Sequence, residues 1–126
     1  LYASVNYMKH APKLKTPADL AAHQCLQLSD MDLHLAKGTQ HVVHKLKNPA
    51  YSVNSMSLLK KLVMQDAGIA VLSVPMMREE IADGSAVRVL PGWCPPDVPV
   101  YALTETRLLP AKTRAFLDYL SAKLKP

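Results

Sequence analysis

The residues best suited to recognise a small molecule form a short polar run, Asn54, Ser55, Met56 and Ser57, between an expected strand and an expected helix. Ligands bind open parallel sheets at such junctions, because the carboxyl end of a strand meets the first turn of a helix there. Free backbone N–H groups and the positive end of the helix dipole favour an anion such as a carboxylate. An amide and a hydroxyl also donate to a carboxylate without leaving a buried charge in the empty site.

The same run has a purely structural explanation, since Ser55 or Ser57 can cap the helix. The two roles are compatible. A second strand-to-helix junction, from Leu72 to Pro75, ends at the same edge of the sheet and is placed to form a neighbouring wall. Pro75 equally suits the first position of an ordinary helix.

Catalytic and metal sites are poorly supported. His41 and His44 are three residues apart in a stretch that reads as extended, so their side chains point to opposite faces and cannot share a metal ion. Ser73 lacks the flanking glycines of a nucleophile elbow. Glu79 and Glu80 are adjacent on a predicted helix and diverge. The chain also has no glycine-rich phosphate loop. We therefore expect no enzyme, no cofactor and no metal.

Composition indicates a globular domain, with 49% apolar and 20% charged residues. Cys25 and Cys94 have no paired C-x-x-C spacing, and we expect both thiols to be buried. The net charge of +5 is scattered along the chain, so we expect solvated charge and no direct nucleic-acid contact by this segment. No apolar stretch is long enough to cross a bilayer, and no leader opens the chain, which predicts a cytoplasmic protein.

The elements around the polar run predict a strand-helix-strand unit. Residues 51–53 read as a strand, residues 58–66 have helical periodicity, and residues 69–72 form a continuous apolar run typical of a strand covered on both faces. Earlier elements are a helix over 17–23 started by Thr16 and Pro17, a strand over 25–28, and a hairpin of 33–35 with 40–44. The predicted class is α/β.

The rest of the chain predicts a helix from Pro75 to about residue 83 and a strand over 86–90. A proline-rich connector then spans residues 91–99. A strand over 100–103 and an amphipathic helix from Pro110 follow. The residues on one side of that final helix are Thr113, Phe116, Leu117, Leu120 and Leu124.

Six short segments, taken in order, resemble the effector-binding domain of LysR-type bacterial transcription regulators. They are residues 1–4 with a following helix that contains Tyr7, then 16–20, 53–55, 67–72, 87–90 and 99–103. The resemblance implies two α/β lobes of periplasmic-binding-protein type 2, each a mixed, largely parallel sheet flanked by helices. Two crossing strands join the lobes, and an effector binds in the cleft between them.

By this resemblance, residues 1–99 are the second lobe with the first crossing strand, and residues 100–126 are the return strand and C-terminal helix of the first lobe. The helix-turn-helix and the first part of lobe one are then missing. Asn54, Ser55 and Met56 become the effector-binding loop, and Tyr2 and Val100 become effector-binding residues that face the cleft near the hinge.

The resemblance also implies a sensing function in place of catalysis. A small organic anion, with a carboxylate as the expected group, closes the lobes and changes the shape of a dimer or tetramer. The outer surface of the helix over 57–66 is a candidate contact between copies. DNA is bound only through the absent segment. A solute-binding protein of a transport system remains the alternative, followed by a small α/β enzyme that uses Ser73 or a histidine.

Overall fold

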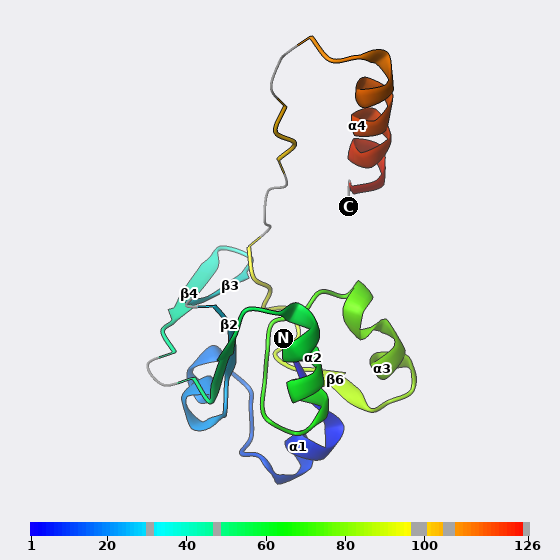
Figure 1. Cartoon of the computed structure of the whole chain (residues 1–126). Helices are drawn as coiled ribbons and strands as arrows, with labels where there is room; N and C mark the ends of the chain where they lie inside the picture. Colours follow the sequence, from blue (N-terminus) through cyan, green and yellow to red (C-terminus); the bar gives the residue numbers. More distant parts are fainter. Residues whose placement is uncertain (30–31, 47–48, 97–100, 105–107, 125–126) are drawn as a thin grey trace. The chain divides into compact units, whose positions relative to one another are not determined.

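The computed structural model describes residues 1–29, 32–46, 49–96, 101–104 and 108–124 (Figure 1). The chain divides into two compact units, Leu1–Pro96 and Asp97–Pro126. Among the described residues, the first unit contains nearly all of the secondary structure, and the second contains one helix.

The parallel part of the first unit is built around β2 (Leu26–Leu28). It pairs in parallel with β5 (Tyr51–Val53) on one side. On its other side, Cys25 forms a parallel bridge with Ile69. The helix α2 (Met56–Met64) connects β5 to Ile69, so the predicted strand-helix-strand unit is present. Of the strand predicted over 69–72, only Ile69 and Ala70 make ladder contacts.

The antiparallel part begins where Ala70 meets β1 (Tyr2–Ser4). The backbone groups of Tyr2 and Ala70 exchange hydrogen bonds of 2.9 and 3.0 Å. On its far side β1 pairs antiparallel with β6 (Ala86–Arg88). The resulting order is β6, β1, the 69–70 segment, β2 and β5, which makes a mixed sheet in an α/β unit as predicted.

The predicted hairpin consists of β3 (Leu33–Lys37) and β4 (Gln40–His44). Gly38 supplies the positive φ of 57° that the tight turn requires. Leu33 and Leu35 are buried while His34 is exposed, which is the alternation of a half-buried strand.

The shorter helices also lie near their predicted positions. The first, α1 (Val5–His10), follows β1 directly, with Ser4 as its N-cap. The helix predicted over 17–23 is a 3-10 helix, η1 (Pro17–Ala22), whose start is fixed by a capping box of Thr16 and Asp19. After Pro75 come η2 (Pro75–Met77) and α3 (Arg78–Ala82).

The core has two clusters, and alternation along the strands assigns them to opposite faces of the sheet. Cys25 and Ile69 belong to one cluster, whereas their neighbours Leu26 and Ala70 belong to the other. Because successive strand residues point to opposite faces, the central segments are buried on both sides. This explains the continuous apolar run at 69–72. Leu59 and Val63 place α2 over the second cluster.

The second unit corrects one prediction. Val100 lies outside the described residues, and residues 101–104 form no strand. Tyr101 is 78% exposed and Leu103 94% exposed. A strand needs a hydrogen-bonded neighbour, and no described strand pairs with this segment. The predicted final helix is present as α4 (Ala111–Leu124).

Candidate functional site

The predicted binding turn lies between the end of β5 and the first turn of α2. Ser55 is the N-cap of α2, and its hydroxyl accepts a hydrogen bond of 3.4 Å from the backbone N–H of Leu58. The structural role proposed for Ser55 is therefore confirmed. Asn54 occupies the bend before this cap and is exposed to solvent.

The first turn of α2 keeps part of its hydrogen-bonding capacity. The N–H groups of Leu58 and Leu59 donate to the Ser55 side chain and carbonyl respectively. The N–H groups of Met56 and Ser57 precede the first intrahelical bond, so the helix itself offers them no acceptor. They add to the positive end of the helix dipole beside Asn54. The turn therefore presents uncharged donors.

The other predicted site residues have different surroundings. Met56 is half-buried and packs against the core cluster beneath α2. Tyr2 is only 4% exposed and belongs to that same cluster, with Leu26 and Leu59. The structure thus brings Asn54, Ser55 and Met56 into one turn and places Tyr2 in the interior. Val100 lies outside the described residues.

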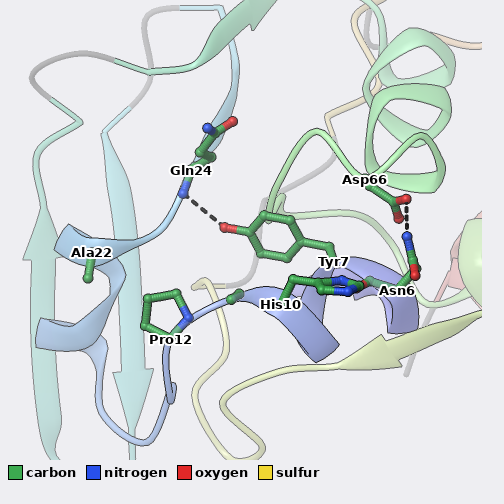
Figure 2. Close-up of a pocket in the computed structure, with 8 residues that line it drawn as sticks. Asn6, Tyr7, His10, Pro12, Ala22, Gln24 and Asp66 are labelled. Atoms are coloured by element: carbon green, nitrogen blue, oxygen red, sulfur yellow. Dashed lines mark hydrogen bonds between the residues drawn. The ribbon is translucent and has the colours of Figure 1, made fainter.

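A second concave region, which no sequence pattern predicted, lies at the other end of α2. This hollow has a volume of about 330 Å³. It lies between α1 and the segments that follow η1 and α2 (Figure 2). Its lining residues are Asn6, Tyr7, His10, Ala11, Pro12, Ala22, Gln24 and Asp66. Only the tertiary fold brings Asp66 next to Asn6, so no local motif could have identified the pocket.

The two cysteines differ, which corrects the prediction that both are buried. Cys25 lies in the core, and desolvation by burial raises the pKa of its thiol to about 11. Such a thiol stays protonated at neutral pH and is a poor nucleophile. Cys94 is exposed, and the Arg88 guanidinium donates to its sulfur at 3.1 Å. It sits in the proline-rich connector, where its backbone exchanges hydrogen bonds of 2.8 and 3.0 Å with Ala36 of β3.

The described part of the chain contains neither a metal-binding cluster nor a membrane-spanning helix. No three His, Cys, Asp or Glu side chains there gather in a group that could hold a metal ion. None of the described helices is both long and apolar enough to span a membrane.

Comparison with known proteins identifies the family. The chain matches the LysR substrate binding domain over residues 1–125. It is 39% identical over 72 residues to the transcriptional regulator PtxR of Pseudomonas aeruginosa, covering 56% of this chain and 23% of that protein. It is 28% identical over 130 residues to the probable regulator LtrA of Klebsiella pneumoniae, covering 94% of this chain and 41% of that protein.

Solved structures agree. The regulatory domain of AphB from Vibrio vulnificus matches with a TM-score of 0.76 and 25% identity, over 96% of this chain and 63% of that domain. CrgA from Neisseria meningitidis, a LysR-type transcriptional regulator, matches with a TM-score of 0.72 and 25% identity, over 99% of this chain and 44% of that protein. The predicted periplasmic-binding-protein-like α/β fold is thereby confirmed.

The chain spans less than half the length of these two sequence relatives. They are transcriptional regulators, and their family is not enzymatic, which confirms the prediction that this chain is not an enzyme. The chain belongs to the LysR substrate-binding domain family, the effector-binding regulatory domain of LysR-type transcriptional regulators.

Proposed function

We propose that the turn from Asn54 to Met56 binds a small organic anion, most simply through a carboxylate, and that this is the effector of a LysR-type regulator. The observation that carries the proposal is the exposed Asn54 amide next to the first turn of α2. The amide and the N–H groups of Met56 and Ser57 are uncharged donors close together. They can hydrogen-bond an anion without the cost of burying a fixed positive charge.

The surroundings of the turn suit an organic anion better than an inorganic one. Met56 is half-buried and offers an apolar, flexible side chain beside the donors. Ser55 uses its hydroxyl to cap α2, so its contribution to a ligand comes through the remaining hydroxyl proton. Asn54 and Ser55 are the residues we assign first. Tyr2 and Val100 remain predictions as hinge residues.

In the proposed signalling step, residues 1–99 form the second lobe and residues 100–126 belong to the first lobe. The anion binds between the second lobe and the remainder of the first lobe. A ligand that binds one arrangement of the lobes more tightly shifts the protein toward that arrangement. Coupling to a dimer or tetramer then changes how a separate helix-turn-helix segment engages DNA in the cytoplasm. Membership of a regulator family favours this role over the solute-binding alternative.

The test is a thermal-shift screen of small aliphatic and aromatic carboxylates, each paired with its neutral amide, on the longest natural form of the protein that carries this chain. A carboxylate should raise Tm while its amide does not. Asn54→Ala should weaken the binding of that carboxylate about tenfold, the value of one lost hydrogen bond to a charged group.

The matched control is Gln65→Ala, which removes an exposed amide from the opposite end of α2. It should leave affinity unchanged. Equal affinities for the natural protein and Asn54→Ala would place the ligand elsewhere. Consumption of a ligand during the assay, abolished by Ser73→Ala, would instead favour the enzyme alternative.

A further inference from the structure

The pocket beneath the C-terminal end of α2 is separate from the predicted effector turn. The helix has nine residues, so its two ends are about 13 Å apart. Asp66 follows its C-terminal cap, Gln65, and forms one wall of the pocket. Figure 2 shows Tyr7 in the middle of the pocket, with Gln24 on one side and Asn6 and Asp66 on the other.

The Asp66 carboxylate is held in a fixed orientation. One oxygen accepts a hydrogen bond from the hydroxyl of Ser4, and the other accepts a bond of 2.5 Å from the amide nitrogen of Asn6. These donors, the Ser4 hydroxyl first, lower the pKa of Asp66, so the group is ionised at neutral pH. A carboxylate has about four acceptor positions, and these two donors, together with the Tyr7 backbone N–H, leave part of that capacity.

The neighbouring polar groups are also arranged to accept hydrogen bonds. The Asn6 amide nitrogen donates one of its two protons to Asp66, and the carbonyl oxygen of that side chain remains as an acceptor. His10 Nδ1 lies 3.0 Å from the backbone oxygen of Asn6, so this nitrogen carries the proton. In neutral His10 the other ring nitrogen, Nε2, is then an acceptor. The Tyr7 hydroxyl oxygen already accepts from the Gln24 backbone N–H at 3.0 Å.

The helix dipole adds to this preference. The C-terminal end of α2 carries the partial negative charge of its last carbonyl groups, which favours a cation. The rest of the lining is apolar or aromatic, with Ala11, Pro12, Ala22 and the ring of Tyr7. An aromatic face attracts an organic cation as well as an alkyl chain.

We propose that this pocket binds a small organic cation, whose ammonium or guanidinium group donates hydrogen bonds to Asp66 and whose alkyl part packs against Tyr7 and Pro12. The lining of the pocket includes no residue of the effector turn and no residue after Asp66. This proposal therefore does not depend on the proposed function. A cationic ligand here bridges α1, the end of η1 and the end of α2, and it stabilises their contact.

The experiment is an NMR titration of the ¹⁵N-labelled chain with n-butylammonium and n-butylguanidinium. Neutral n-butanol and anionic butyrate serve as probes of the same length. The cations should cause saturable shifts of the backbone amides of Asn6, Tyr7, Gln24 and Asp66. Saturable shifts of equal size with n-butanol, or cation-induced shifts confined to other residues, would overturn the proposal.

Two variants and a control locate the binding. Asp66→Asn removes the charge, and Ala22→Phe fills the hollow without touching the bonds between Ser4, Asn6 and Asp66. Each should weaken n-butylammonium binding at least tenfold. The control, Asp83→Asn, changes another exposed carboxylate, which caps α3 and accepts from the Ser85 N–H at 2.8 Å. It should leave the Kd unchanged.

If Asp66→Asn fails to fold, n-butylammonium binding by Ala22→Phe tests the proposal. Unchanged binding in a folded Ala22→Phe variant would mean that the cation does not occupy the hollow, and that Asp66 only tethers α2 to the start of α1.

Discussion

The two ends of α2 (Met56–Met64) differ in the sign of charge that they present. At the N-terminal end, Asn54 and the first-turn N–H groups offer uncharged donors. At the C-terminal end, the Asp66 carboxylate and nearby acceptors line a hollow. One helix dipole favours an anion at the first and a cation at the second. A single secondary-structure element therefore positions both of the proposed recognition surfaces, and we expect them to prefer ligands of opposite charge.

The ends also differ in how they are fixed. The N-terminal end is held by a local cap, the Ser55 hydroxyl to Leu58. The C-terminal end is held by long-range contacts, from Asp66 to Ser4 and from Gly68 to Gln24. Substitutions at the C-terminal end should accordingly have larger effects on stability.

The largest effect is expected from Gly68→Ala. A Cβ at this position would lie 2.2 Å from the backbone oxygen of Gln24, with φ at +146°. Because the obstacle is backbone, we expect a loss of about 3 kcal/mol or more in the free energy of unfolding. Urea denaturation measures it.

The control for Gly68→Ala is Gly84→Ala. Gly84 also has a positive φ, +75°, but nothing lies within 4 Å of an added Cβ. Its cost should be about 1 kcal/mol, the strain of the left-handed conformation alone. Similar losses for the two variants would contradict the close approach at Gly68.

At the N-terminal end, Ser55→Ala should cost about 1 kcal/mol, the usual value of a lost N-cap. Ser57→Ala, in the exposed first turn, should change the free energy of unfolding by less than about 0.5 kcal/mol. Chemical denaturation of the two variants compares them. A larger loss for Ser57→Ala would mean that the helix begins differently from the structure described above.

The smallest expected effect is on the loss of stability at acidic pH. The folded-state pKa of Asp66 is lowered, first by the Ser4 hydroxyl and then by the Asn6 amide, so it lies below the unfolded value of about 4. This contribution to stability is present above the unfolded pKa and is lost as pH falls through the folded pKa. Asp66→Asn should therefore lose less stability than the natural chain between about pH 5 and pH 3.

Asn54→Ala, at the uncharged end of α2, should keep the acid dependence of the natural chain. Thermal unfolding at a series of pH values follows all three proteins. Parallel curves for Asp66→Asn and the natural chain would show that the Asp66 hydrogen bonds contribute nothing in solution.

Sequence predicted those features that depend on near neighbours in the chain. Thr16 with Asp19 marks the start of η1, and Ser55 marks the start of α2, because a cap and its partners are at most three residues apart. The alternation of Leu33 and Leu35 likewise identified β3. Local signals of the same kind predicted the candidate effector turn.

Features that depend on distant partners were missed or mispredicted. Ser4 and Asp66 are 62 residues apart, and no sequence pattern around either residue predicts their contact. The strand predicted over 100–103 rested on residue type alone, and the described residues 101–104 have no pairing strand. Cys94 was predicted to be buried because free cysteines are usually interior, but the connector around it leaves it exposed.

Anion recognition at Asn54 is tested most directly by an NMR titration of the ¹⁵N-labelled chain with benzoate, with benzamide as the neutral probe of the same shape. We predict saturable shifts of the backbone amides of Ser55, Met56 and Ser57 with benzoate and none with benzamide, while the amide of Asp66 stays unchanged. Benzoate-induced shifts that spare the turn, or equal shifts with benzamide, would contradict the assignment.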